Sequence, residues 1–278
     1  MPTPALATLP TRPAEPADYP HFARLFPELG VDDPIPPPDR WAEVFAPQIL
    51  FFEHGGEVIA YTYFQVLQGV GYVRHVVVDP RRRGQGVGRA VMDAIAARFR
   101  AAGCSRWCLN VKPTNEPAIR LYRAVGMAPE YTSTAFRFGW DLLDRLPRGD
   151  RAVIARPVAP AEDAALEAAF HLPAGQIASA RARPDVVLLR LADPAAPEDA
   201  RVGFASYDPK FPGAFPFRVG HPTLAAPLLE AIRRHELPGA PHMQLVVEND
   251  DALAELLVQA GATVRLRALH MAGDLPPT

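Results

Sequence analysis

A basic, glycine-rich turn separates a strand pattern from a helical pattern in the first half of the chain. It reads Arg83-Gly84-Gln85-Gly86-Val87-Gly88-Arg89, and an apolar helical stripe starts within it at Val87. Glycines let successive backbone N–H groups converge on one point and let a phosphate approach closely. A helix N-terminus adds partial positive charge, and Arg83 and Arg89 add full charges. The turn is therefore suited to holding a pyrophosphate.

Two phosphate-binding motifs of similar composition do not fit this turn. The dinucleotide fingerprint G-x-G-x-x-G needs a glycine spacing different from that of Gly84, Gly86 and Gly88. A P-loop needs Gly-Lys-Ser/Thr, which the turn does not contain. On the turn alone, a tight strand-to-helix connection with exposed arginines stays open as the alternative.

A second group of candidate residues lies in the next helical pattern. Asn115 stands where a helix N-cap belongs, Pro117 lies in the first turn, and Gly126 closes the helix. Tyr122 follows two turns after Asn115, on nearly the same helix face. Taken alone, such a tyrosine is more often a packed aromatic side chain than a catalytic group.

Strands and helices must position these two groups. β-Branched and aromatic enrichment predicts strands over residues 49–53, 57–67, 71–78, 105–111 and 131–142. Apolar residues four apart predict the helix from Val87, which Gly103 ends. The strand over 71–78 therefore leads directly into the glycine-rich turn.

Part of the sequence recurs in the second half of the chain. Arg12-Pro13 with Pro16-Ala17 recurs as Arg156-Pro157 with Pro160-Ala161, residues 91–95 recur as 228–232, and Leu121 and Gly126 recur as Leu256 and Gly261. Three matches in the same order indicate a duplicated domain with small insertions or deletions. The expected organisation is a disordered leader over 1–10, a domain over 11–144, a linker over 145–150 and a domain over 151–278.

Together the two groups resemble the GCN5-related N-acetyltransferase (GNAT) superfamily. Its acyl-CoA signature, Arg/Gln-x-x-Gly-x-Gly/Ala, is met from Arg83 to Gly88, and its later helix is matched by Asn115, Leu121-Tyr122 and Gly126-Met127. The resemblance covers residues 11–142 and, with the repeat, implies a tandem protein of class α/β (α+β mixed). Each of two GNAT-fold domains would be a mixed, mostly antiparallel, twisted sheet flanked by helices.

The resemblance also implies a role for each candidate residue. The coenzyme A pyrophosphate would be bound by Arg83, Gly84, Gln85, Gly86, Val87, Gly88 and Arg89. The backbone of Val76 and Val78 would pair with the pantetheine arm like an added strand. Asn115 would hydrogen-bond the pantetheine, and Tyr122, the catalytic residue, would donate a proton to the departing thiolate. No metal is implied.

The implied activity is transfer of an acetyl group from acetyl-CoA to a primary amine by direct attack on the thioester. The acceptor would be a small-molecule or peptide amine. His75, Glu53 and a water relay stay open as the general base. The alternative is an acyl-CoA-binding sensor or pseudoenzyme without turnover, so the N-terminal domain is expected to bind the cosubstrate in either case.

The second half keeps the repeat but loses the site. The positions of Arg83, Gly86 and Gly88 become Gly220, Thr223 and Ala225, and those of Asn115 and Tyr122 become Asp250 and Leu257. These changes stiffen the turn and remove positive charge. A degenerate C-terminal copy that does not bind acetyl-CoA is expected.

Composition excludes several other classes. The chain is 49% hydrophobic and 22% charged with a formal charge of −2, which is typical of a globular protein and argues against a nucleic-acid binder. No apolar run reaches the length of a membrane span, and no signal peptide is recognisable. Cys104 and Cys108 are expected to be buried thiols. A cytoplasmic monomer or homodimer is therefore expected.

Overall fold

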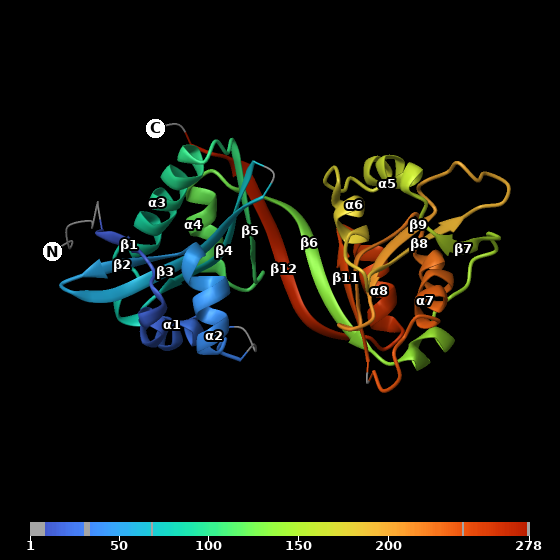
Figure 1. Cartoon of the computed structure of the whole chain (residues 1–278), viewed down its shortest axis with the longest axis horizontal. Helices are drawn as coiled ribbons and strands as arrows, with labels where there is room; N and C mark the ends of the chain where they lie inside the picture. Colours follow the sequence, from blue (N-terminus) through green and yellow to red (C-terminus); the bar gives the residue numbers. More distant parts are fainter. Residues whose placement is uncertain (1–8, 31–33, 68, 241, 277–278) are drawn as a thin grey trace. The chain divides into compact units, whose positions relative to one another are not determined.

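The described residues form two compact units (Figure 1). The computed structural model describes residues 9–30, 34–67, 69–240 and 242–276. The first unit contains the described residues of Met1–Glu130 and Leu269–Thr278, and the second is Tyr131–Ala268. Of the leader expected over 1–10, residues 1–8 lie outside the described residues. Residues 9 and 10 differ from the expectation, because Leu9 is buried and the Pro10 carbonyl accepts the Glu53 N–H.

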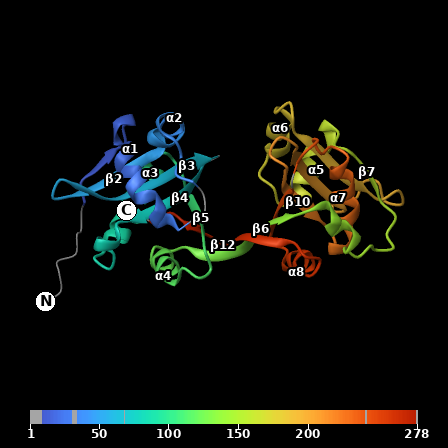
Figure 2. The ribbon, with the colours of Figure 1, turned by 90° about the horizontal axis from the view of Figure 1, so that it is seen from below.

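The first unit is a mixed sheet covered on both faces. Its strands are, in spatial order, β1 (Thr11–Pro13), β2 (Ile49–His54), β3 (Glu57–Leu67), β4 (Val70–Val78), β5 (Arg106–Val111) and the C-terminal end of β12 (Thr263–Asp274). Only β4 and β5 are parallel neighbours in this order. One face packs on α3 (Val87–Ala101) and α4 (Glu116–Ala124), and the other packs on α1 (Tyr19–Leu25) and the segment that follows α2 (Pro38–Arg40). Figure 2 shows α1 and α2 side by side.

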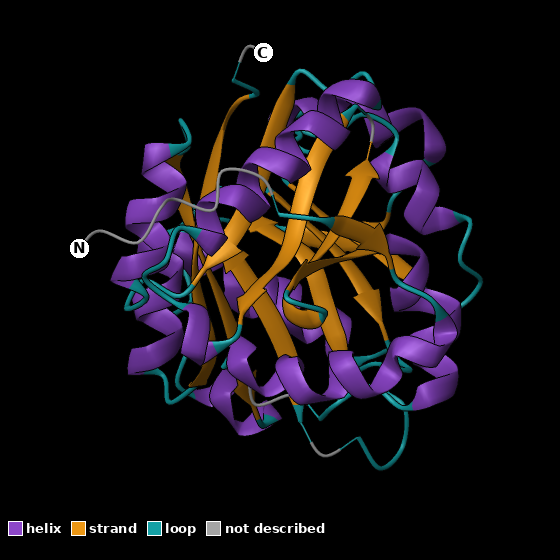
Figure 3. Ribbon diagram, turned by 90° about the vertical axis from the view of Figure 1, so that its left-hand side faces the viewer, coloured by secondary structure: helices purple, strands orange, loops and turns teal. Residues whose placement is uncertain are grey.

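The second unit has the same order of elements. Its sheet runs β7 (Ile154–Pro157), β8 (Val187–Ala192), β9 (Gly203–Asp208), β10 (Gly213–Val219), β11 (Met243–Glu248) and β6 (Ala128–Phe138). Its helices are α5 (Asp163–Ala169), α6 (Gln176–Arg181), α7 (Ala225–Arg233) and α8 (Asp251–Gln259), and helices flank the strands in Figure 3. Only β10 and β11 are parallel. The expected fold class is confirmed: in each unit the strands are mixed, mostly antiparallel and flanked by helices. No helix within the described ranges is long and apolar enough to cross a membrane.

The units differ from the expected domain boundaries because each takes its last strand from the other half of the sequence. β6 leaves the first unit and pairs antiparallel with β11, and the end of β12 pairs antiparallel with β5. The expected linker over 145–150 is part of the second unit, since Leu146 is buried in its core and Arg145 donates to the Ala260 carbonyl. The strand expected over 131–142 ends at Phe138, and a 3-10 turn follows.

An ion pair explains the repeated Arg-Pro-x-x-Pro-Ala sequence. Arg12 donates to both carboxylate oxygens of Asp18, at 2.6 and 2.8 Å. Arg156 makes the same two bonds to Glu162, at 2.8 and 2.6 Å. In each copy the carboxylate also accepts a backbone N–H three residues earlier, which caps the turn that leads into the first helix. The repeat therefore preserves the same ion pair and the same capped turn at the start of each half.

Helix α3 packs closely on β4 because Gly71 has no side chain. A Cβ built on Gly71 would lie 2.3 Å from Cδ2 of Phe99, whose ring is fully buried and has no room to move aside. We therefore expect Gly71→Ala to lower the free energy of unfolding by about 1–3 kcal/mol. Urea denaturation measures this loss, and an unchanged midpoint would mean that α3 shifts without cost.

Candidate functional site

The strands β4 and β5 separate at the point where the glycine-rich turn begins. Their parallel pairing runs from Val70 opposite Arg106 to Val73 opposite Leu109, whereas β4 continues to Val78. The Asp79 N–H donates to the Ile59 carbonyl at 2.8 Å. Because hydrogen bonding alternates along an antiparallel pair, the N–H and C=O groups of Val76 and Val78 point away from β3. No strand pairs with this edge of β4 beyond Val73. The Val78 carbonyl on it accepts Arg83 Nε at 3.1 Å, and the N–H groups of Val76 and Val78 are left for an extended ligand.

The turn after β4 presents a run of backbone donors. Gly84 and Gly86 have φ of +75° and +83°, which side-chain-bearing residues rarely adopt. The first helical bond of α3 runs from the Ala90 N–H to the Gly86 carbonyl at 3.1 Å. The N–H groups of residues 84–89 make no hydrogen bond to any residue that the structure describes. Six successive donors at a helix N-terminus form an anion site.

The arginines of the turn already make hydrogen bonds and ion pairs within the first unit. Arg83 donates to the Val78 carbonyl at 3.1 Å and to Glu28 at 2.8 Å. Arg89 pairs with Asp93 at 2.9 Å, and Gln85 donates to the Arg81 carbonyl at 3.0 Å. Anion binding at the turn therefore depends mainly on the backbone.

Arg82 is a further candidate that the sequence did not single out. Its half-buried side chain makes no hydrogen bond or ion pair with a described residue. It lies in a short 3-10 turn that Asp79 caps through the Arg81 N–H at 3.0 Å. Because three arginines stand in a row, spacing alone did not distinguish the unpaired one.

Asn115 and Gly88 place helix α4 beside the turn. The Asn115 carbonyl oxygen accepts the Ala118 N–H at 3.2 Å, so Asn115 is the expected N-cap and its amide NH₂ is left for a ligand. A Cβ built on Gly88 would lie 3.0 Å from Cδ2 of Leu121, so glycine lets α3 approach α4 closely here.

Tyr122 lies on the buried side of α4. Its side chain belongs to the core cluster below α3 and is 8% exposed. Its hydroxyl makes no hydrogen bond with a described residue. Burial raises the pKa of Tyr122 to about 12, so the phenol stays protonated at neutral pH and is able to donate a proton.

The two side chains considered as general base lie in different surroundings. The His75 ring Nδ1 lies 3.3 Å from the Tyr61 hydroxyl, on the face of β4 opposite Val76. Burial, and to a lesser extent the charge of Arg74, lowers the pKa of His75 to about 4, so the ring is neutral at pH 7. Glu53 accepts a hydrogen bond from Arg12 Nε at 2.8 Å. His75, Glu53 and a water relay all stay predictions for the base.

The depressed pKa of His75 links the free energy of unfolding to pH. Between the ordinary value of 6.5 and about 4, the unfolded chain binds the proton more readily than the folded chain, so stability falls as pH falls through this window. We expect a loss of about 2–3 kcal/mol from this group. Urea denaturation at pH 7 and pH 4 measures it in the wild type and in His75→Asn. Equal pH dependence in both proteins would contradict the expectation.

A polar group beside the gap between β4 and β5 was missed from sequence. Asn110 donates to the Tyr72 hydroxyl at 2.9 Å, and its carbonyl oxygen lies 2.9 Å from Nδ1 of His270. Tyr72 faces away from α3, on the same side of β4 as His75. His270 comes from β12, at the far end of the sequence, so no local spacing joins it to this site.

Both cysteines lie in the interior of the first unit. Cys104 and Cys108 are unpaired and buried, as expected. Burial is the main cause that raises the pKa of Cys108, to about 11. A thiol held protonated in this way is a poor nucleophile at neutral pH.

In the corresponding turn of the second unit, backbone N–H groups are already hydrogen-bonded within the turn. Thr223 N–H donates to the His221 ring at 3.3 Å, and Leu224 N–H donates to the His221 carbonyl at 2.9 Å. A 3-10 turn leads straight into α7, without the glycines of the first copy. Asp250 caps α8 through the Leu253 N–H at 2.9 Å, as Asn115 caps α4, but Leu257 is a core residue.

Comparison with known families identifies the first unit. Residues 18–127 match the family model described as "Acetyltransferase (GNAT) family". This segment belongs to the GNAT family. It contains β4, the glycine-rich turn and α4 up to Tyr122, so the family match and the free donors coincide in one stretch of chain.

Solved structures with the GNAT fold resemble the whole chain. A GCN5-related N-acetyltransferase from Sphaerobacter thermophilus has a TM-score of 0.63 at 19% identity and covers 97% of this chain and 98% of that one. A tandem GNAT protein from the clavulanic acid biosynthesis pathway has a TM-score of 0.56 at 17% identity over 97% of this chain and 99% of that one. At these identities the likeness shows the fold, and it extends over both units.

One curated relative matches a short stretch at higher identity. The mycothiol acetyltransferase of Thermobispora bispora is 42% identical over 57 residues. The match covers 20% of this chain and 19% of that protein, so the chain spans about a fifth of the length of this relative.

Proposed function

We propose that the first unit transfers an acetyl group from acetyl-CoA to a primary amine. The observation that carries the proposal is the run of unengaged N–H groups over residues 84–89 next to the free edge of β4. Pyrophosphate needs several convergent donors, and an extended pantetheine arm needs a strand edge with which to pair. The donor run and the strand edge together suit a coenzyme A thioester. The match to an acetyltransferase family supports acetyl as the group that is transferred.

The residues of the unit have separate tasks in the proposed reaction. A bound thioester supplies an activated acetyl carbonyl and a thiolate leaving group. The amine nitrogen attacks that carbonyl, the new C–N bond forms and the C–S bond breaks. An N–H from the free edge of β4 donates to the carbonyl oxygen as negative charge develops on it. Tyr122 donates its proton to the departing sulfur, and the proton of the amine leaves to His75, Glu53 or water.

The acceptor is proposed to enter on the face of the sheet that carries His75. Tyr72, Asn110 and His270 line the gap between β4 and β5 on this face and offer hydroxyl, amide and imidazole groups. Such a set suits a polar amine, either a small molecule or a peptide. A nucleic-acid acceptor is not proposed. The arginines that could bind its phosphates, Arg81, Arg83 and Arg89, are already paired with carboxylates.

Calorimetric titration of acetyl-CoA into the full chain tests the proposal, followed by release of free thiol with a panel of amines. We expect about one equivalent bound per chain and turnover with at least one amine. Binding without turnover across the panel would favour the alternative, an acyl-CoA sensor or pseudoenzyme. Two equivalents would mean that the second unit also binds the thioester, and no binding would refute the proposal.

A further inference from the structure

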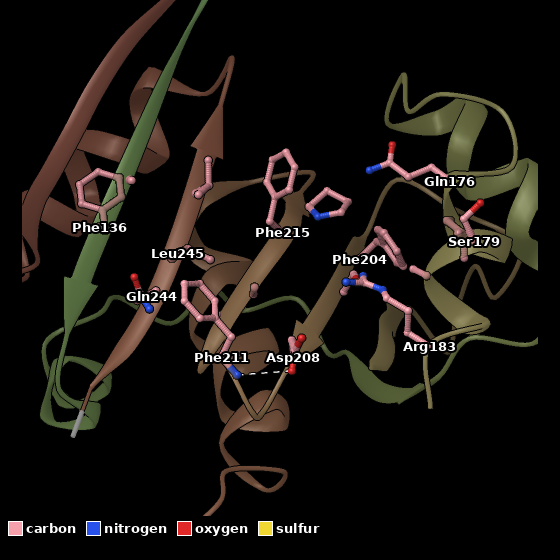
Figure 4. Close-up of a pocket in the computed structure, with 18 of the residues that line it drawn as sticks. Phe136, Gln176, Ser179, Arg183, Phe204, Asp208, Phe211, Phe215, Gln244 and Leu245 are labelled. Atoms are coloured by element: carbon pink, nitrogen blue, oxygen red, sulfur yellow. Dashed lines mark hydrogen bonds between the residues drawn. The ribbon is translucent and has the colours of Figure 1, made fainter. Parts of the chain in front are cut away.

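The second unit contains a cavity of about 590 Å³ on the face of its sheet that α6 covers (Figure 4). Strands β9, β10 and β11 form its floor, and α6 with the residues after it forms one wall. Cavities of about 300–1,000 Å³ are the usual size of small-molecule sites. The cavity lies within the unit that lacks the phosphate-binding turn.

The cavity exists because this face of the second unit is filled less completely than the same face of the first. In the first unit, large aromatic side chains fill the space below α1, namely Phe22, Trp41, Phe51 and Tyr61. In the second, Phe204 is the one aromatic among the described buried residues of the corresponding cluster. The parallel pairing of β10 with β11 covers only Gly213 and Ala214, which leaves the floor open. Phe211 and Phe215 remain 66% and 48% exposed at its edge.

A buried hydroxyl faces this cavity without a partner. Phe204, Ser206 and Asp208 alternate along β9 and line it together. Ser206 is 4% exposed, and its hydroxyl makes no hydrogen bond with a described residue. The hydroxyl lines the cavity and is available to donate to or accept from a polar atom of a ligand there.

The charges around the cavity favour an anion. Figure 4 shows the Arg183 side chain directed into it, and Arg265 lines it as well. Neither guanidinium has a hydrogen bond or ion pair to a residue within the described ranges. Asp208, the one carboxylate among the described lining residues, already accepts the N–H groups of Lys210 and Phe211 in its own turn. Two unpaired cations therefore face one carboxylate that is partly satisfied.

We propose that this cavity binds a small amphipathic carboxylate with an aromatic or other apolar body. The apolar body would pack among Phe204, Phe211 and Phe215, Ser206 would pair with a polar atom of the ligand, and Arg183 would bind the carboxylate. The site differs from the acetyl-CoA site proposed above, because the turn before α7 has no free run of donors for a pyrophosphate. It is independent of acetyl transfer in the first unit.

Three probes with one apolar body and different charges test the proposal. Calorimetric titration of 4-phenylbutyrate, 4-phenylbutanamide and 4-phenylbutylamine into the full chain compares an anion, a neutral group and a cation. We expect the carboxylate to bind about tenfold more tightly than the amide, since hydrogen bonds to a charged acceptor are the stronger ones, and the amine to bind most weakly. Tightest binding of the amine, or no binding of any probe at millimolar concentration, would overturn the proposal.

Surface variants locate the site without disturbing the core. Ser179 is exposed on α6 at the cavity wall, so Ser179→Trp should obstruct the cavity and abolish binding of 4-phenylbutyrate. Arg183→Gln should remove the roughly tenfold preference for carboxylate over amide. Arg234→Gln, an exposed arginine outside the cavity and also unpaired among described residues, is the matched control and should leave binding unchanged. Binding that survives both Ser179→Trp and Arg183→Gln would place the ligand elsewhere and refute the assignment.

Discussion

Gly86→Glu is expected to raise the Kd of acetyl-CoA by at least about 100-fold, which corresponds to about 3 kcal/mol. Gly86 has φ of +83° and ends the loop directly before α3. A glutamate there would strain the turn that aims the N–H groups of residues 84–89 at one point, and would bring a negative charge next to the pyrophosphate. Calorimetric titration of acetyl-CoA into wild type and variant measures the loss.

Gly103→Glu is the matched control for this substitution. Gly103 ends the same helix, has φ of +77°, and, like Gly86, has no heavy atom within 4 Å of a built Cβ. Both variants should therefore lose a similar amount of stability, about 1 kcal/mol, through backbone strain alone. Only Gly86→Glu should bind acetyl-CoA more weakly than the wild type. Equal affinity in the two variants would separate the turn from acetyl-CoA binding and remove the main support for the proposed function.

Local signals in the sequence were sufficient to predict the elements around the site. Apolar spacing from Val87 to Phe99 predicts α3, and those side chains are buried against the sheet. Asn115 caps α4 as its position suggests, and Gly126 follows that helix with φ of +90°. Each of these features depends on residues within one or two turns of each other, so one segment contains the whole signal.

Strand pairing across the two halves could not be predicted in the same way. β6 and β12 follow equivalent helices in the two repeats, so the order of elements along the sequence does not say which unit each strand joins. The structure pairs Leu269 with Val111, and Phe138 with Met243. Because pairing partners are chosen by long-range packing, His270 enters the first unit without any local signal.

The arginines and the cavity show a second limit of sequence reasoning. Arg83 resembles a free cation in the motif, yet Glu28, which lies 55 residues earlier in the chain, pairs with it. The cavity depends on summed side-chain volumes on one face of a sheet, contributed by elements far apart in the sequence such as α6 and β9. Neither a distant charge partner nor a volume deficit has a short-range pattern.

Tyr122→Phe is expected to lower kcat by at least about 100-fold while the Kd of acetyl-CoA stays within about twofold of the wild-type value. The phenol hydroxyl makes no hydrogen bond with a described residue, so phenylalanine keeps the packing of the ring and loses only the proton donor. Without that donor the thiolate must depart unprotonated, which raises the barrier for breaking the C–S bond. Steady-state release of free thiol, together with calorimetry, measures both quantities.

Tyr207→Phe is the control for the loss of a buried phenol. Tyr207 is fully buried in the second unit, and its hydroxyl has no hydrogen-bond partner among the described residues. This variant should keep kcat unchanged and keep or raise Tm, because it removes an unsatisfied buried group from the unit that does not hold the proposed thioester site. If Tyr122→Phe instead raised the Kd of acetyl-CoA and left kcat unchanged, Tyr122 would be a binding residue. The proton for the departing sulfur would then have to come from water or from another group of the first unit.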